Sequence, residues 1–331
     1  MELATHDICN KWQKKLIEDM IEFFYGRRGN MQKSQDGDQK PRPAFPFKES
    51  YVNVNGGRLY SLTMGKGRPL IVIHGGPGLT KDYLLPQMAR LARHNEVVFY
   101  DQRGGGKSTG DFTKENMTVE VFVEDVESLR KSLGYGKISL LGHSWGGLLA
   151  MHYAISHPEI IDRLVLMNPM PGSSEEYASY SSDWLPQDDP ARDELDRVEK
   201  SEEFAKGDPA TFAYYYRIIF SRYCHDPSKA DELNLNMTQK AALNGAKVRD
   251  MVGQNLFSKP YDLHGRLKDL RVPALIIQGD SDIIPVTAGK HLHASIPGSR
   301  YVLIENCGHF PYIENPEALF SCLNDFLSKP R

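Results

Sequence analysis

The 331-residue chain has few cysteines, little net charge and no long apolar run. Its four cysteines lack Cys-x-x-Cys spacing, which predicts a reduced, cytoplasmic protein with neither a disulfide framework nor a cysteine metal site. The formal net charge is −3 and Lys and Arg do not cluster, so no nucleic-acid partner is expected. Apolar residues never continue for the length that spans a membrane, and no membrane partner is expected.

The first 46 residues are predicted to be an N-terminal helix and a flexible linker. Apolar residues recur at helical spacing between Ile8 and Tyr25, whereas the stretch from Gly26 to Pro46 is polar and rich in Gly, Lys, Asp, Gln and Pro. Charged residues near the start interrupt any signal-peptide core. The helix is interpreted as a packing element that could join copies of the chain in a homo-oligomer.

From residue 47 onward, strand patterns alternate with helix patterns. A hairpin signal at Asn55-Gly56-Gly57 opens the series, and the alternation predicts an α/β fold with a mostly parallel sheet and helices on both faces. The expected strands are 51–55, 58–64, 69–74, 96–101, 137–141, 163–167, 274–278 and 300–304, and the expected helices are 81–91, 119–133, 145–156, 285–296 and 316–327.

The alternation stops between residues 169 and 263. This segment is charged, aromatic and helix-prone, which predicts a helical cap inserted over the carboxyl ends of the strands, where open α/β sheets bind ligands. The core then comprises 47–168 and 264–331. Tyr215, in an aromatic cluster of the cap, is a candidate substrate contact.

Residues 142–146 read Gly-His-Ser-Trp-Gly between a buried strand and a helix. A nucleophile on such a sharp turn needs small neighbours, because the strained backbone leaves no room for side chains. Ser144 is therefore the candidate nucleophile, and the helix N-terminus behind it would favour a developing negative charge.

A serine nucleophile needs a base and a carboxylate that orients the base. On this fold the chain order is Ser, acid, His, with the acid after a late strand and the histidine after the last one. Asp282 and Asp280 compete for the acid role; Asp282 is preferred, because Asp280 can tie the turn to backbone N–H groups. His309, after the last expected strand, is the candidate base.

Acyl transfer also needs two N–H donors for the carbonyl oxygen. The N–H of Trp145, directly after the nucleophile, is the first candidate. The second is expected in the loop His74-Gly75-Gly76-Pro77-Gly78, with Gly75 preferred and Gly76 as the alternative.

These motifs together resemble the proline iminopeptidase (prolyl aminopeptidase) group of the α/β-hydrolase superfamily, over roughly Tyr51 to Leu327. The resemblance implies the α/β-hydrolase fold, the triad Ser144, Asp282 and His309, and the oxyanion hole of Gly75 and Trp145. It rests on residues 74–78, Asp82-Tyr83-Leu84-Leu85-Pro86, Phe99-Tyr100-Asp101-Gln102-Arg103-Gly104, residues 142–147, Gly279 to Asp282, and Gly308-His309.

The sequence departs from this group where substrate is chosen. The aminopeptidases hold the free α-amine of the substrate with carboxylates, whereas the local counterparts here are the aliphatic Leu256 and Ile283. A buried ammonium without a carboxylate is strongly disfavoured. Leu256, Ile283 and Phe310 are therefore candidate substrate contacts, and four other carboxylates could substitute as anchors: Glu175, Glu176, Glu202 and Asp250.

The favoured hypothesis is a serine hydrolase that needs neither cofactor nor metal. It would cleave a small, largely apolar ester, lactone or amide. The alternative is a proline iminopeptidase-type aminopeptidase that uses a different cap carboxylate. A third hypothesis, a non-catalytic ligand receptor on a hydrolase scaffold, requires no complete triad and is disfavoured because every member is present.

Overall fold

The computed structural model describes residues 46–181 and 185–329. The helix and linker predicted for the N-terminal segment therefore lie outside the described residues, apart from Pro46. Within the described ranges, no helix combines the length and apolarity needed to cross a membrane.

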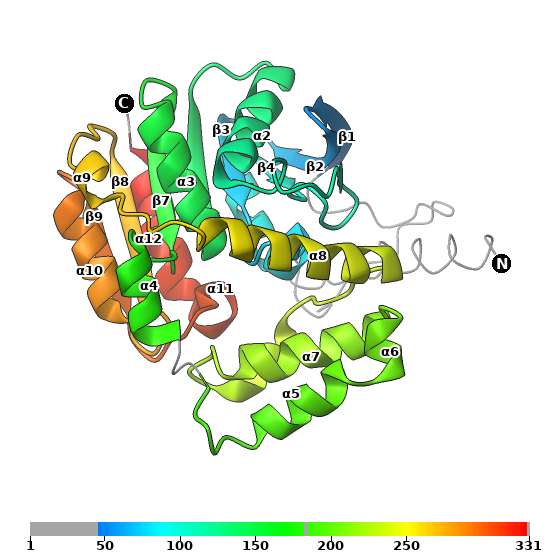
Figure 1. The fold of residues 1–331 in the computed structure, drawn as a ribbon. Helices are drawn as coiled ribbons and strands as arrows, with labels where there is room; N and C mark the ends of the chain where they lie inside the picture. Colours follow the sequence, from blue (N-terminus) through cyan, green and yellow to red (C-terminus); the bar gives the residue numbers. More distant parts are fainter. Residues whose placement is uncertain (1–45, 182–184, 330–331) are drawn as a thin grey trace, which may run out of the picture.

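The described residues form one nine-stranded mixed sheet (Figure 1). The strands run in the order β1-β2-β4-β3-β6-β7-β8-β9, with β5 beside β2. The neighbours from β4 through β3 to β9 are parallel, and β2 pairs antiparallel with β1, β4 and β5. The strands are β1 (Phe47–Val54), β2 (Gly57–Gly65), β3 (Arg68–Ile73), β4 (Asn95–Tyr100), β5 (Thr109–Gly110), β6 (Ile138–His143), β7 (Ile161–Met167), β8 (Ala274–Gly279) and β9 (Arg300–Ile304).

Helices lie on both faces of the sheet, and one of them departs from the sequence prediction. The single helix expected over 81–91 is two short 3₁₀ helices, because Pro86 has no N–H to continue a helical ladder. The core helices are η1 (Lys81–Leu84), η2 (Gln87–Arg93), α2 (Val119–Ser132), α3 (Trp145–Ser156), α9 (His264–Leu267), α10 (Val286–Ser295), α11 (Pro311–Glu314) and α12 (Pro316–Ser328).

Each face of the sheet has its own hydrophobic core. Alternate residues of β3 point to opposite sides, so Leu70 and Val72 pack with η2 and α12, whereas Ile71 and Ile73 pack with α2 and α3. Burial on both sides explains why the central strands are apolar throughout.

Between β7 and β8 the chain forms helices that cover one end of the sheet (Figure 1). The longest, α8, passes so close to the loop after β3 that a Cβ on Gly78 would lie 2.0 Å from the carbonyl oxygen of Gly245. Only glycine allows this approach. The helices of this cap, which ends before α9, are α4 (Ser174–Ser181), α5 (Ala191–Glu199), α6 (Glu202–Ala205), α7 (Pro209–Ser221), η3 (Pro227–Glu232) and α8 (Gln239–Leu256).

A buried ion pair joins the loop after β4 to α2. Arg103 donates from Nε to Asp125 at 3.0 Å and from Nη2 at 2.6 Å, and both side chains are almost fully inaccessible. The pair fixes the loop through a planar, two-point contact.

Replacing Asp125 by alanine should leave the Arg103 guanidinium buried without its partner. We expect the free energy of unfolding to fall by about 3–5 kcal/mol. Glu317→Ala, which breaks the exposed pair with Arg90, should cost less than about 1 kcal/mol. Chemical denaturation of both variants measures the contrast, and equal losses would contradict it.

Candidate active site

Four strand ends bring the predicted site residues to one edge of the sheet. Because β3, β6, β8 and β9 are all parallel, the loops after them meet at their carboxyl ends. Gly75, Ser144, Asp282 and His309 follow these strands in turn.

Ser144 lies on the sharp turn between β6 and α3, with a φ of 57° and a ψ of −122°. Its neighbours have no room for side chains: a Cβ on Gly142 would lie 2.2 Å from the carbonyl oxygen of Gly146, and one on Gly146 would lie 2.2 Å from that of Ile73. Ser144 is partly accessible, although the residues on either side of it are buried. The turn therefore leaves Ser144 accessible, while close packing fixes the backbone on either side of it.

Asp282 and His309 form a direct contact, with His309 Nδ1 2.7 Å from Asp282 Oδ1. The Asp282 side chain is fully buried and that of His309 is 4% exposed. Asp280 instead accepts the backbone N–H groups of Asn306 and Cys307 at 3.0 and 3.1 Å. Asp280 therefore ties the turn, and Asp282 is the carboxylate that reaches the histidine.

Asn168, directly after β7, is a supporting residue that the sequence analysis missed. Its Nδ2 donates to Asp282 Oδ2 at 2.7 Å and to the carbonyl oxygen of Gly308 at 3.0 Å. It holds the carboxylate and the histidine loop together. The signal in the sequence was its place directly after a predicted strand at the same sheet edge.

A second missed group joins the loop after β3 to His309. Gly75 N–H donates to Tyr83 Oη at 2.6 Å, Tyr83 Oη lies 2.6 Å from His143 Nδ1, and His143 Nε2 lies 2.9 Å from the carbonyl oxygen of His309. Burial lowers the pKa of His143 well below its usual range, so the ring is neutral. Since a carbonyl only accepts, His143 donates from Nε2 and accepts the Tyr83 hydroxyl proton at Nδ1.

This network corrects the choice of Gly75 as an oxyanion donor. Its N–H is already directed to the Tyr83 hydroxyl, so it is not directed at a substrate. Gly76, the alternative in the same loop, has no such bond among those described and lines the same cavity as Ser144. Trp145 is the first residue of α3, where backbone N–H groups have no partner within the helix.

Gln102 connects the oxyanion loop to the nucleophile turn. Its Nε2 donates to the carbonyl oxygen of His74 at 2.6 Å, and its Oε1 accepts the Trp145 indole N–H at 2.9 Å. Because both partners are buried, one side chain sets the spacing of the two loops.

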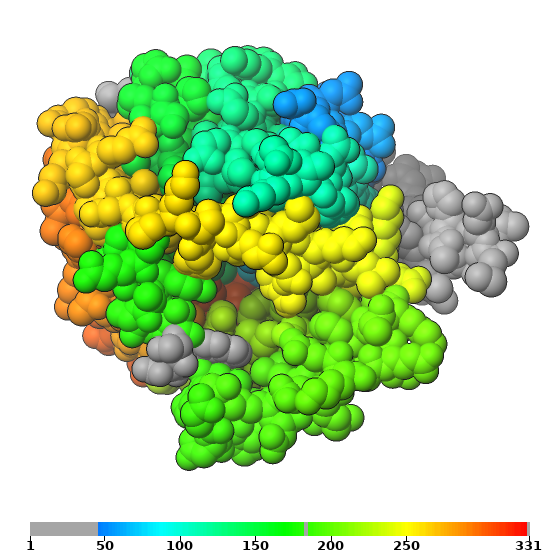
Figure 2. Space-filling model, viewed as in Figure 1, coloured from blue at the N-terminus to red at the C-terminus, as the bar shows by residue number. Residues whose placement is uncertain are grey.

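The site opens into a cavity of about 360 Å³ between the core and the cap. Figure 2 shows this face hollowed below α8, between that helix and the other cap helices. Ser144 and His309 line the cavity, and so do three of the four predicted substrate contacts: Leu256, Ile283 and Phe310. A volume of this size suits a small ligand.

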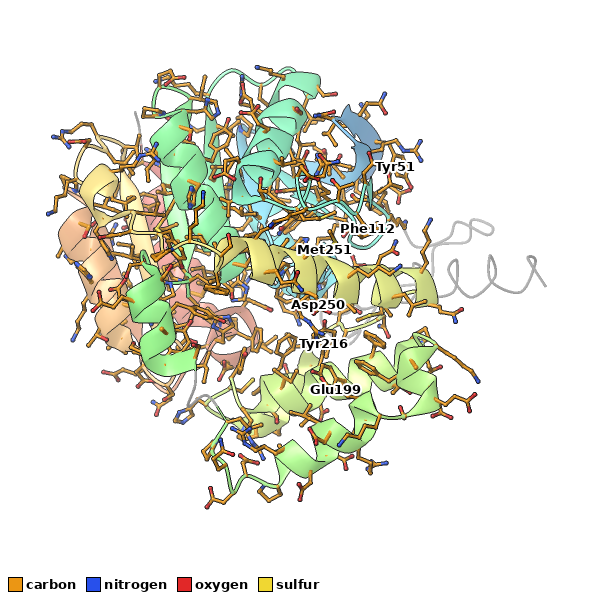
Figure 3. The ribbon with its side chains drawn as sticks, in the orientation of Figure 1. Tyr51, Phe112, Glu199, Tyr216, Asp250 and Met251 are labelled. Atoms are coloured by element: carbon orange, nitrogen blue, oxygen red, sulfur yellow. The ribbon has the colours of Figure 1, made fainter. Side chains whose placement is uncertain are left out.

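Tyr215, the fourth predicted contact, is turned away from the cavity. Its hydroxyl donates to Glu199 Oε1 at 2.5 Å and its ring packs on Phe204 within the cap. Tyr216 takes the wall position, between α7 and α8 (Figure 3). A helix turns about 100° per residue, so neighbouring residues face different sides, and the aromatic run alone could not tell them apart.

No aspartate or glutamate is found among the described residues that line the cavity. The four carboxylates considered as substitute amine anchors, Glu175, Glu176, Glu202 and Asp250, all lie off its wall. Arg249 is on the wall, beside tyrosines and aliphatic side chains. Beyond His143 and His309, the described surface around Ser144 is therefore mainly apolar and phenolic, and its one arginine is paired with Asp250 at 3.1 Å.

Residues 68–316 match the family described as the alpha/beta hydrolase fold. Together with the sheet order and the serine turn, this match shows that the chain belongs to the α/β-hydrolase family and is a hydrolase.

Within that family the chain is proline iminopeptidase-like. It is 30% identical over 82% of its length to a proline iminopeptidase of Clostridium botulinum, covering 94% of that protein. It is 29% identical to one of Saccharolobus solfataricus over 85% of its length and 92% of the relative. The crystal structure of VinJ is 25% identical, with a TM-score of 0.65 over 85% of this chain and 98% of the other.

Asn168→Gly should lower kcat by about ten- to one-hundred-fold, because Asp282 loses a hydrogen bond to its charged carboxylate. Glycine keeps the positive φ of 45° at this position without strain. Asn306→Gly, at an exposed residue with a φ of 52°, is the matched control and should keep wild-type turnover. Ester turnover and melting temperature are measured together; normal kcat in Asn168→Gly would contradict the assigned support.

Proposed function

We propose that this hydrolase cleaves a small, largely apolar ester, lactone or amide through a serine acyl-enzyme. The observation that carries the proposal is the 2.7 Å contact between His309 and Asp282, beside a cavity that Ser144 and His309 share. Ser144, Asp282 and His309 occur along the chain in the order nucleophile, acid, base that is typical of this fold.

In the first half of the reaction Ser144 Oγ attacks the carbonyl carbon while His309 Nε2 takes the hydroxyl proton. Asp282 accepts the Nδ1–H of His309 and stabilises the imidazolium that forms. The N–H groups of Trp145 and Gly76 bind the oxyanion, at the positively polarised end of α3. The leaving group departs with the proton from His309.

In the second half a water molecule attacks the acyl-enzyme. His309 takes a proton from the water and returns it to Ser144 Oγ, which releases the acid and restores the serine. Tyr83 and His143 act as positioning residues, because their hydrogen bonds reach the backbone of Gly75 and His309.

Charge around the cavity favours a substrate without a free amine. The described wall carries Arg249, whose Nε pairs with Asp250 at 3.1 Å, and no carboxylate of its own, so an ammonium group bound there would lose its hydration without a counter-charge on the wall. Burial raises the pKa of Tyr180 and Tyr223, which keeps both phenols neutral. A neutral acyl group suits this wall better.

The second candidate function is an aminopeptidase that releases N-terminal residues from peptides. The observation that favours it is the similarity to proline iminopeptidases over most of the chain. Against it, the aliphatic Leu256 and Ile283 both lie on the cavity wall. They are the counterparts of the carboxylates that hold the substrate amine in the proline iminopeptidase group.

The partner proposed for the chain is its small-molecule substrate. The cytoplasmic location, the lack of nucleic-acid and membrane partners, and self-association through the N-terminal helix stay predictions from the sequence.

Ser144→Ala should abolish labelling by a fluorophosphonate probe and all ester turnover, because it removes the hydroxyl that is proposed to attack. Ser179→Ala, at an exposed serine of α4, is the control and should label normally. Labelling is read on a gel and turnover with p-nitrophenyl esters. Turnover retained in a clean Ser144→Ala preparation would overturn the nucleophile.

A paired assay separates the two substrate classes. We expect p-nitrophenyl esters to be cleaved and the naphthylamides of proline and alanine to resist, because the amine finds no counter-charge. Leu256→Glu should raise the ratio of prolyl-naphthylamide to ester turnover by at least about tenfold, because one charge-assisted contact to the substrate amine contributes about that much. Leu256→Gln has the same shape without charge and should not. Efficient cleavage of prolyl-naphthylamide by the wild type would favour the aminopeptidase.

A further inference from the structure

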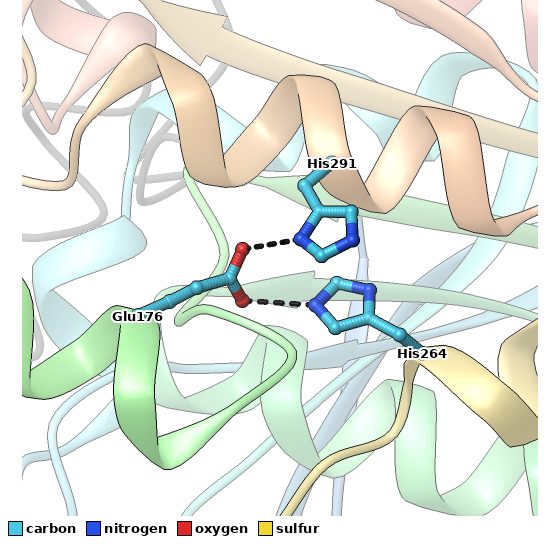
Figure 4. Close-up of side chains that lie close together, drawn as sticks. All are labelled: Glu176, His264 and His291. Atoms are coloured by element: carbon cyan, nitrogen blue, oxygen red, sulfur yellow. Dashed lines mark hydrogen bonds and ion pairs between the residues drawn. The ribbon is translucent and has the colours of Figure 1, made fainter.

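Three side chains that take no part in the serine site meet where the cap joins the core (Figure 4). Glu176 lies on α4, the first helix of the cap, and His264 opens α9, directly after the cap. His291 lies on α10 of the core. A bridge between Ser173 and Asp262 brings the two ends of the cap side by side at this point.

Both imidazoles face the same carboxylate. His264 Nε2 lies 2.9 Å from Glu176 Oε2, and His291 Nδ1 lies 2.7 Å from Glu176 Oε1. The two rings stack with centroids 3.6 Å apart and planes 15° from parallel. One nitrogen of each ring and one carboxylate oxygen all lie within 4.8 Å of one another.

The protons on these groups are constrained by Ser295. Its Oγ lies 2.8 Å from the carbonyl oxygen of His291 and 2.7 Å from His264 Nδ1. Because a carbonyl only accepts, the Ser295 hydroxyl donates to the His291 carbonyl and accepts the Nδ1–H of His264. This leaves Nε2 of His264 as the ring nitrogen that faces Glu176.

One ring nitrogen of each histidine and one oxygen of Glu176 converge at this junction. We propose that Glu176, His264 and His291 bind one divalent transition-metal ion of the zinc type. Two imidazole nitrogens and one carboxylate oxygen are a zinc ligand set with an open fourth position. The Nδ1–H of His264, donated to Ser295, is the outer hydrogen bond that orients a metal-bound histidine.

The dimensions of the cluster fit this ion once the two stacked rings splay apart, because a nitrogen lone pair lies in its ring plane and both planes must contain the ion. Tetrahedral ligands at about 2.0–2.2 Å from zinc lie roughly 3.3 Å from one another, close to the two short contacts already present. Ser173 Oγ, 3.1 Å from Glu176 Oε2, holds the carboxylate from the other side. The His291 side chain is 54% exposed, which leaves an entry path and room for water as a fourth ligand.

The ion would act as a clip between cap and core. None of its three ligands lines the cavity, so it takes no part in the serine chemistry. Tyr177 and Tyr180 do line the cavity and share α4 with Glu176. Binding would therefore fix this wall of the cavity and raise the stability of the cap junction.

The test uses the full chain, free of an affinity tag and treated with a chelator, and titrates it with ZnCl₂ by calorimetry and with CoCl₂ by visible absorption. We expect one equivalent of Zn²⁺ to bind with micromolar or tighter affinity, and bound Co²⁺ to show the intense bands of a tetrahedral site. Zinc in hundredfold excess over its Kd should raise the melting temperature by about 5 °C.

His291→Ala and Glu176→Gln should each weaken Zn²⁺ binding by about 100-fold. His293→Ala and Glu175→Gln, at exposed neighbours outside the cluster, are matched controls and should bind as the wild type does. Each variant is compared with its own metal-free melting curve. Absence of a stoichiometric site, or equal binding by all four variants, would overturn the proposal. Neither result depends on the proposed hydrolase activity.

Discussion

Close approach of backbone around Ser144 is the constraint on which the rest of the site depends. The serine has a positive φ, and the glycines on either side of it lie against backbone oxygens at distances that no Cβ could occupy. Such a conformation costs about 1–3 kcal/mol, and the packed sheet and α3 supply the compensating contacts. The loop after β3 comes equally near, since a Cβ on Gly75 would lie 2.7 Å from Ser144 Cβ. Nucleophile and oxyanion loop are thus fixed together.

Buried polar side chains then hold the other parts of the site relative to that turn. Gln102 spans the two loops, Tyr83 and His143 carry the contact on to the backbone of His309, and Asn168 joins Asp282 to the histidine loop. These groups are buried and joined by hydrogen bonds, and such a network adds rigidity. The placement of Ser144, Asp282 and His309 therefore depends on the whole sheet edge.

Much of this arrangement follows from local pattern. The order of the strands and the serine turn could be predicted, because the loops after parallel strands meet at one edge of the sheet. Asp282 could be preferred over Asp280, because an aspartate directly after a strand can tie the turn to backbone N–H groups. Other expectations failed where a tertiary contact decides between two neighbouring residues of the same type. Gly75 and Gly76 look alike in the chain, and only the Tyr83 hydroxyl distinguishes them. Tyr215 and Tyr216 differ only in which side of α7 they occupy.

The sequence by itself determined the family and the fold class and proposed Ser144, Asp282 and His309, since short motifs in a fixed order carry this information. Only the tertiary structure decided what surrounds them. The described cavity wall draws on both core and cap, and its charge depends on which carboxylates turn away from it. Glu176, His264 and His291 are separated by as many as 115 positions. No spacing in the sequence predicts this cluster, because its three residues come from three segments that meet only in the folded chain.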